Sequence, residues 1–174
     1  MNKLLELGLV RRDGKAGVAY FSKDGLYRYA LERHWAIGSR RILWIMLNPS
    51  VADHDRDDLT IKKCIGFSKL WQASALRVVN IFAYISTDPK ELLSWGDPEG
   101  ALALPVIEAA GQDCDKVICA WGALPRELAR RSWPTRQRIK ELYADKMQCL
   151  GRTAGGYFPR HPSRIGYSTP LESW

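Results

Sequence analysis

The chain has 174 residues and a mass of 19.8 kDa, a length that fits one domain better than two. Apolar residues make up 46% of it and aromatic residues 10%, which excludes a disordered or low-complexity chain. The formal net charge is +7, and no stretch approaches the roughly 18 uninterrupted apolar residues of a membrane span. We therefore expect a single domain, 1–174, that resides in the cytoplasm without membrane contact, and we take a monomer as its simplest state.

The order of apolar runs and helical patterns predicts the fold class. Alternating aromatic residues around an Asp-Gly turn predict a β-hairpin over 17–35, within an N-terminal extension, 1–38. Apolar runs predict buried strands, and the segments between them predict helices over 59–70, 97–110 and 136–145; the strands are expected at 41–47, 76–83, 116–121 and 147–150. This alternation predicts an α/β fold, a three-layer α/β/α sandwich with a central four-stranded, mostly parallel sheet.

The basic residues are concentrated in the last third of the chain. Residues 123–174 hold ten lysines and arginines against four acids, whereas residues 1–122 hold sixteen against fifteen. This excess of basic residues suits DNA binding, because neutralised phosphates release their counterions. The alternative, held to be about equal on charge alone, is a basic surface that contacts only solvent. For DNA contact we predict a face lined or flanked by Arg130, Arg131, Arg136, Arg138, Arg152, Arg160 and Arg164.

Two groups of residues bear on metal binding. The four cysteines are 50, 5 and 30 residues apart, which fits neither zinc ligation nor a disulfide framework, so we expect buried free thiols. The Asp53–Asp58 run lacks a helical H-x-x-x-H spacing and a calcium-loop glycine. We expect a solvated loop whose Asp58 caps the next helix, and we predict no metal and no cofactor.

Polar residues follow the predicted strands where ligands bind in open parallel sheets, beyond the carboxyl ends. The sequence places there Asn48, Pro49, Ser50, Asn80, Trp121 and His161. Asn80 is the most informative, because an amide buried within an apolar strand costs about 1–3 kcal/mol unless it is paired. The others have ordinary structural explanations: Asn48 could form a turn before proline, and His161 could be a solvated imidazole.

Taken in order, these motifs resemble the uracil-DNA glycosylase superfamily, especially its mismatch-specific branch. In that superfamily a first strand ends in a water-positioning motif, a later strand ends in a base-reading Asn, a third carries an L-W-G-like segment, and an H-P-S-P-L-like loop follows the last. The matching segments here are Leu47-Asn48-Pro49-Ser50, Val78-Val79-Asn80, Ala120-Trp121-Gly122 and His161-Pro162-Ser163-Arg164-Ile165.

A second likeness covers nearly the whole chain and is to a bacterial and phage family of domains of unknown function. It is carried by Tyr27-Arg28-Tyr29, Arg33, Trp35, Leu47–Asp53, Cys64–Phe67 and Arg160–Pro162. The glycosylase likeness is the narrower of the two, because it depends on about fifteen residues within this longer pattern.

The glycosylase resemblance implies an enzyme that flips a modified or mismatched base from DNA and hydrolyses its N-glycosidic bond without metal or cofactor. It implies that Asn48 holds the attacking water, that Asn80 bonds the polar edge of the base, and that His161 donates to a base oxygen. Further residues take binding roles: Pro49, Ser50, Phe67 and Trp121 at the base, Ser163 at a phosphate, and Ile165 as the wedge that fills the gap in the stack. The candidates for stacking on the base are Phe67, Trp71 and Tyr84, and core packing is the default explanation for all three.

Departures from the superfamily pattern leave alternatives open. Leu47 stands where the superfamily has a glycine, and Ser50 stands where it has a glycine or a tyrosine. Asn rather than Asp at position 48 implies slow hydrolysis, because an amide cannot act as a general base. One alternative is a non-catalytic binder of a modified nucleobase, nucleotide or DNA that uses the same pocket. Another is a metal-dependent hydrolase that uses the Asp53–Asp58 run and His161.

Overall fold

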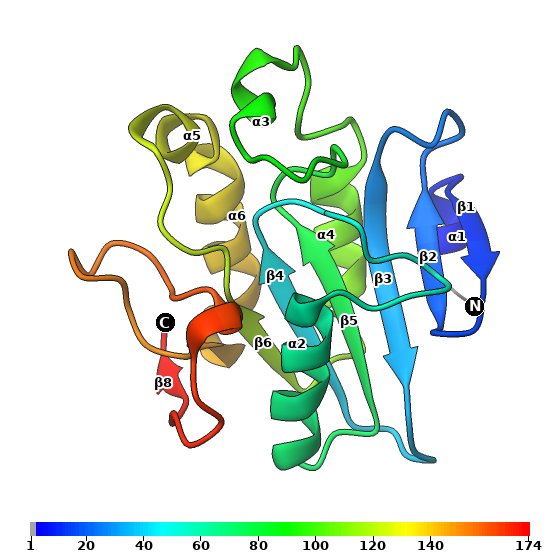
Figure 1. Cartoon of the computed structure of the whole chain (residues 1–174), viewed down its shortest axis with the longest axis vertical. Helices are drawn as coiled ribbons and strands as arrows, with labels where there is room; N and C mark the ends of the chain where they lie inside the picture. Colours follow the sequence, from blue (N-terminus) through cyan, green and yellow to red (C-terminus); the bar gives the residue numbers. More distant parts are fainter. Residues whose placement is uncertain (1–2) are drawn as a thin grey trace.

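The computed structural model describes residues 3–174; residues 1–2 of the predicted domain lie outside the described part. One eight-stranded sheet has the order β1-β2-β3-β5-β4-β6-β7-β8 (Figure 1). Its strands are β1 (Val10–Asp13), β2 (Val18–Phe21), β3 (Arg28–His34), β4 (Arg41–Met46), β5 (Ala75–Asn80), β6 (Lys116–Cys119), β7 (Met147–Cys149) and β8 (Glu172–Ser173). The helices are α1 (Lys3–Glu6), α2 (Leu59–Leu70), α3 (Glu91–Ser94), α4 (Ala103–Ala110), α5 (Arg126–Arg131) and α6 (Trp133–Tyr143), with 3-10 turns at Ala144–Lys146 and Pro162–Arg164.

The predicted α/β class is confirmed, but the sheet differs from the one predicted. Among the described strands four of the seven junctions are antiparallel, so a mixed eight-stranded sheet replaces the expected four-stranded, mostly parallel one. The parallel junctions join β5 to β4, β4 to β6 and β6 to β7. The predicted hairpin is present as β2 and β3, and β3 continues the sheet by pairing with β5, which gives β5 a partner on its second edge.

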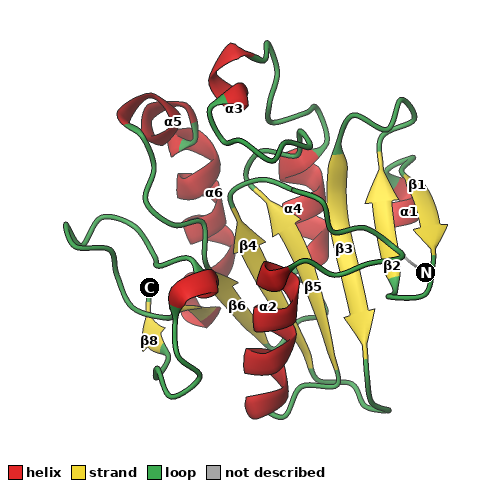
Figure 2. Ribbon diagram, in the orientation of Figure 1, coloured by secondary structure: helices red, strands yellow, loops and turns green. Residues whose placement is uncertain are grey.

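Helices cover both faces of the sheet (Figure 2). Residues Ile42 and Trp44 of β4 face α2, whose apolar side buries Ile61, Cys64 and Phe67. The alternate residues of β4 face α4, α5 and α6, with Val106 and Ile107 of α4 in the same cluster. This alternation is what a strand buried on both sides requires, because successive side chains point to opposite faces.

Local hydrogen bonds explain where the helices α2 and α4 begin. The Asp58 carboxylate accepts a hydrogen bond from the Ile61 N–H at 2.8 Å, and α2 has the predicted bounds. The predicted helix over 97–110 is shorter, because Asp97 accepts from the Gly100 N–H at 3.1 Å and Gly100 has a φ of 73°. Residues 97–102 therefore form turns, and α4 begins at Ala103.

Other strand and helix boundaries also differ from the predicted ones. The strand β5 ends at Asn80, earlier than predicted, although the Ile81 N–H still donates to the Met46 carbonyl at 3.0 Å. The helix expected over 136–145 begins three residues earlier, with Pro134 in its first turn. The short elements α1, β1, α3, α5 and β8 were not predicted. None of the helices formed by residues 3–174 is long and apolar enough to cross a membrane.

Candidate functional site

A cavity of about 280 Å³, here called the central cavity, lies at the carboxyl ends of β4, β5 and β6. The chain leaves β4 over one face through α2 to reach β5, and it leaves β5 over the other face through α4 to reach β6 on the opposite side of β4. Ligands of open α/β sheets bind at such a switch point. The lining includes Asn48, Asn80 and His161, so the structure brings these three residues together, and Ser50 and Trp121 also line it.

Asn48 is held by the backbone around it. Its Nδ2 donates to the Pro49 carbonyl at 3.0 Å and to the Ser86 carbonyl at 2.8 Å. These two bonds set the orientation of the amide and leave Oδ1 as the atom that can accept a hydrogen bond from a ligand or water. Pro49 itself is buried and does not line the cavity, which places it behind the site rather than in it.

Asn80 and Trp121 present unused donors. Asn80 is 3% exposed at the end of β5, and its Nδ2 has no hydrogen-bond partner among the described residues. The Trp121 Nε1 is likewise buried and unpartnered within residues 3–174. A buried donor without a partner costs about 1–3 kcal/mol, and native proteins keep few of them. Two such donors on one cavity are groups that a bound ligand or water with acceptor atoms would satisfy.

His161 is oriented by its own loop. Its Nδ1 lies 2.9 Å from the Ser163 hydroxyl and accepts a hydrogen bond from the Ser163 N–H at 3.3 Å. Burial lowers the pKa of His161, and Asp58 acts in the opposite direction. Because Nδ1 accepts, the neutral ring carries its proton on Nε2, where it can donate to a ligand. The Ser163 side chain therefore positions the imidazole, and its phosphate contact stays a prediction.

Arg28 and Asp58 also line the central cavity, although the sequence analysis gave neither a role in base binding. Arg28 is the first residue of β3, and its guanidinium donates to the Ala52 carbonyl while its Nε has no partner among residues 3–174. Asp58 caps α2 with one carboxylate oxygen. The signal that could have found Arg28 is its place between two aromatic residues of a buried strand, Tyr27 and Tyr29.

The predicted stacking and wedge residues lie elsewhere. Phe67 is fully buried in the core beneath α2, with its ring 5.5 Å from that of Trp71. Tyr84 stacks on Trp95 with ring centroids 4.2 Å apart. Ile165 is buried in the α2-side core, so it does not project from the surface as a wedge. Apolar packing explains all three placements, and the prediction that they touch a base or the DNA stack is not met by this geometry.

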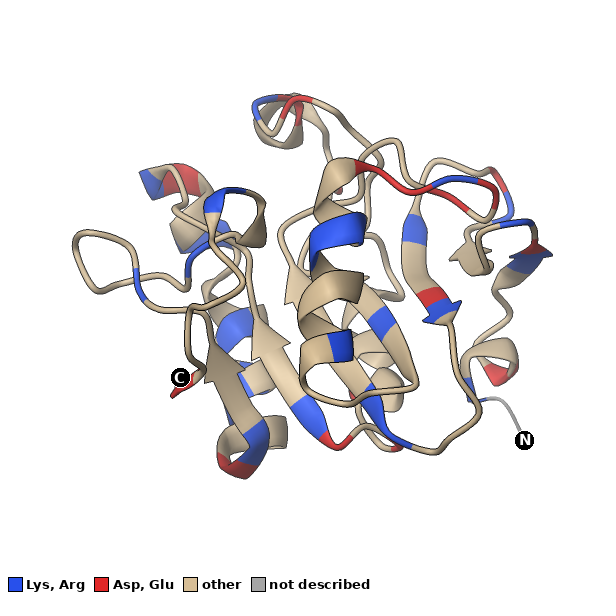
Figure 3. Ribbon diagram, turned by 60° about the horizontal axis from the view of Figure 1, so that its bottom comes forward, with Lys and Arg blue, Asp and Glu red and all other residues tan. Residues whose placement is uncertain are grey.

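The predicted DNA-binding arginines divide into three groups. Three form ion pairs: Arg131 with Glu99 at 2.8 Å, Arg138 with Glu108 at 2.9 Å and Arg152 with Glu172 at 3.4 Å. Arg136 lies over Trp133 and Phe158 at 5.4 and 5.5 Å from the ring centroids. The other three are exposed and form no ion pair with the described residues: Arg130, Arg160 and Arg164. Figure 3 shows basic positions spread over several elements, with the acidic loop before α2.

The candidate metal ligands are engaged in other contacts. Asp53 accepts from the backbone N–H groups of Asp55 and Arg56 at 2.8 and 3.0 Å, and Asp57 pairs with Arg33 at 2.8 Å. No group of three His, Cys, Asp or Glu side chains within residues 3–174 could hold a metal ion. The four cysteines are buried and free, as expected, and burial raises the pKa of Cys119 well above its ordinary value.

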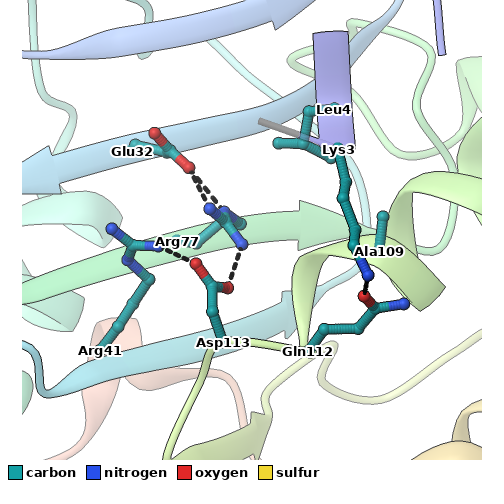
Figure 4. Close-up of a pocket in the computed structure, with 8 residues that line it drawn as sticks. All are labelled: Lys3, Leu4, Glu32, Arg41, Arg77, Ala109, Gln112 and Asp113. Atoms are coloured by element: carbon teal, nitrogen blue, oxygen red, sulfur yellow. Dashed lines mark hydrogen bonds and ion pairs between the residues drawn. The ribbon is translucent and has the colours of Figure 1, made fainter. Parts of the chain in front are cut away.

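A wider cavity of about 580 Å³ lies on the α4 side of the sheet, toward the amino end of β4 (Figure 4). Arg77 reaches Glu32 at 2.6 Å and Asp113 at 2.7 Å, Arg41 also pairs with Asp113, and Lys3 bonds Gln112. These charges largely satisfy one another, although the Arg41 Nε is unpartnered in the described part of the chain. The wider cavity is therefore a charged structural network, and the central cavity is the candidate site.

Comparison with known proteins identifies one family. The sequence profile of a family described as "Protein of unknown function (DUF1643)" matches residues 28–163. No curated protein and no solved structure matches the chain, so a relation to the uracil-DNA glycosylase superfamily stays a prediction. The match begins at Arg28 and ends at Ser163, and it includes every residue of the central cavity discussed above. The chain therefore belongs to the DUF1643 family of proteins of unknown function.

Proposed function

We propose that this protein is a DNA glycosylase-type hydrolase, which receives a modified or mismatched base in the central cavity and cleaves its N-glycosidic bond. The observation that carries the proposal is the buried, unpartnered Asn80 Nδ2, in a cavity that Asn48 and His161 also line. Each of these residues follows, or ends, a different strand of one sheet. Together they surround a space whose wall also carries two donors, Asn80 Nδ2 and Trp121 Nε1, that have no partner within residues 3–174.

The size of the central cavity favours a single heterocycle. Its volume of about 280 Å³ lies just below the range of roughly 300–1,000 Å³ that drug-sized ligands occupy. The polar edge of a base carries carbonyl oxygens, which can accept the hydrogen bonds that Asn80 Nδ2 and Trp121 Nε1 do not make within the described residues. Met46, Leu47 and Val78 provide apolar contact for the ring faces. A nucleobase therefore fits this cavity better than a long or purely apolar ligand.

The same residues can support hydrolysis. The bond between C1′ and the base nitrogen breaks with its electron pair on the base, and the oxygen of a water molecule bonds to C1′. His161 Nε2–H donates to a base oxygen as negative charge develops there, which is the kind of preorganised stabilisation that lowers such barriers. Asn48 Oδ1 accepts a hydrogen bond from the water and orients it, and the water proton leaves with the base. This chemistry uses side chains alone.

A groove beside the central cavity suits the DNA strand. It is lined by Trp133, Tyr157, Arg136, Arg152 and Lys140, and Trp121 belongs to both the groove and the central cavity. Trp133 is 56% exposed and Tyr157 is 78% exposed, so their rings are available for stacking. Basic side chains among exposed aromatic rings are typical of surfaces that hold single strands. We call this surface the aromatic–basic groove.

One observation favours the alternative of a non-catalytic binder. The Asn48 amide is tied to two backbone carbonyls, an arrangement that also serves to hold the loop after β4. An amide does not remove a proton from water, so recognition without turnover is chemically consistent with this residue. The binder would use Asn80, Trp121 and His161 in the same way, and it would differ only in the absence of products.

Turnover distinguishes the two functions. Oligonucleotides that each carry one modified or mismatched base are incubated with the protein, and abasic sites are detected by alkaline strand cleavage. We expect product from at least one substrate, reduced about 10²–10³-fold by His161→Gln, since such losses follow removal of one preorganised donor. His34→Gln, at the exposed end of β3, is the matched control and should retain activity. Tight stoichiometric binding without product would establish the binder, and neither binding nor product would refute both.

A further inference from the structure

Arg28 stands between two cavities. It lines the central cavity, and it also lines a second one of about 500 Å³, here called the outer cavity, which includes Arg12, His54 and Arg56. Ser50 is the other residue common to both. Arg28 and Ser50 therefore lie at the boundary between the two cavities.

The Arg28 charge is buried without a counterion. The residue is 3% exposed, its guanidinium donates to the Ala52 carbonyl, and its Nε has no partner in the described part of the chain. It forms no ion pair with any carboxylate of residues 3–174, although Asp58 and Asp53 lie near enough to act on it electrostatically. Burial lowers the pKa of Arg28 to about 10, so the group stays protonated at neutral pH.

Two neighbouring arginines show how this sheet normally treats a buried guanidinium. Arg33, on the same strand as Arg28, pairs with Asp57 at 2.8 Å. Arg77 on β5 pairs with Glu32 at 2.6 Å and with Asp113 at 2.7 Å. Buried charges are costly unless they are paired, and both of these are. Arg28 has no such ion pair within residues 3–174, and it lines the central and outer cavities.

The carboxylates near Arg28 already have partners. Asp58 accepts the N–H of Ile61 at the start of α2. Asp53 accepts two backbone N–H groups and lies 3.7 Å from Arg56. Glu91, in the outer cavity, accepts the Ser86 hydroxyl at 2.5 Å. None of them is an ion-pair partner for Arg28, so the guanidinium keeps donor capacity for an anionic group from outside the chain.

We propose that Arg28 binds an anionic oxygen group of the ligand, a carboxylate or a phosphate, at the junction of the central and outer cavities. The proposal rests on the proposed function in one respect: it takes the heterocycle in the central cavity as the part of the ligand that carries this group. The guanidinium offers planar, directed N–H donors that match the two oxygens of either group. The oxyanion belongs either to a carboxylated ring or to the phosphate of a nucleotide.

Matched ligand pairs test the proposal by isothermal titration calorimetry. The probes are uracil against 5-carboxyuracil, and the four deoxynucleosides and deoxyuridine against their 5′-monophosphates, with inorganic phosphate alone as a further arm. We expect the charged member of at least one pair to bind tenfold or more tightly than the neutral member. A gain in the first pair assigns the group to the ring, and a gain in the others assigns it to the sugar phosphate.

Variants locate the effect at Arg28. Arg28→Gln should remove the gain, Arg28→Lys should keep part of it, and Arg11→Gln, at an exposed position of β1, should leave it unchanged. If Arg28→Gln fails to fold, Arg28→Lys locates the effect, because a reduced gain in this variant and an unchanged gain in Arg11→Gln are expected. Affinities within twofold in every pair, or no binding by any charged probe, would overturn the inference.

Failure of this inference is distinguishable from failure of the proposed function. Base removal from oligonucleotides without any oxyanion gain would reject the role of Arg28 and keep the hydrolase. A clear gain that depends on Arg28, without base removal from any oligonucleotide, would reject the hydrolase and keep the oxyanion site.

Discussion

Replacing Asn80 with leucine should stabilise the protein while it removes ligand binding. Leucine has nearly the shape of asparagine but no donor, and the Asn80 Nδ2 is buried without a partner among the described residues. Relieving one unsatisfied buried donor is worth about 1–3 kcal/mol. At about 2–4 °C per kcal/mol for a chain of this size, the melting temperature should rise by at least about 2 °C. Function and stability are then in conflict at this position, as is common at binding sites.

Thermal denaturation monitored by circular dichroism measures the melting temperature. Urea denaturation gives the change in the free energy of unfolding, with an unchanged slope as evidence that the unfolded state is the same. The matched control is Ser68→Ala. The Ser68 hydroxyl accepts a hydrogen bond from Trp44 Nε1 at 3.0 Å, so its loss leaves a buried donor unpaired and should lower stability. Opposite signs for the two variants are the expected result. Comparable destabilisation by both would mean that the Asn80 amide is satisfied in the free protein, and the argument for a waiting ligand would fail.

Three further predictions concern the wider molecule. Because burial lowers the pKa of His161 below its ordinary 6.5, protonation favours the unfolded state. The free energy of unfolding should therefore be greatest above about pH 7 and fall toward pH 5, and it should fall less steeply in His161→Gln. Identical pH profiles for the two proteins would contradict this. Glu32→Ala should lower the free energy of unfolding by about 3 kcal/mol, because Arg77 loses a buried partner; a loss under about 1 kcal/mol would mean that Asp113 suffices. Trp133→Ala should weaken single-stranded oligonucleotide binding by about 1–3 kcal/mol in fluorescence anisotropy, and unchanged affinity would exclude the aromatic–basic groove.

Local signals predicted the elements that depend on local physics. The bounds of α2 were predicted correctly because Asp58 caps the helix and one face of it is apolar. The convergence of Asn48, Asn80 and His161 on one cavity was predicted from a rule about strand ends, which holds here because β4, β5, β6 and β7 run in the same direction. An amide inside an apolar strand was the clearest single signal, because burial without a partner needs an explanation.

Tertiary pairing decided the features that sequence patterns missed. The pairing of β3 with β5 places Arg28 beside the central cavity, and nothing in the alternation of the hairpin specifies that partner. The ion pair of Arg131 with Glu99 joins residues far apart in the chain, so the predicted DNA contact could not be separated from a structural one. Phe67 was assigned to the base site, but an aromatic residue on the apolar face of a helix packs into the core.

The most direct measurement is a crystal structure of the protein soaked with free nucleobases and, separately, with 5-carboxyuracil. The account predicts a planar ring in the central cavity, with a ring oxygen within hydrogen-bond distance of Asn80 Nδ2 and of His161 Nε2. A cavity that stays empty at millimolar ligand, or a ring bound elsewhere with the Asn80 amide paired to water or protein, would contradict it.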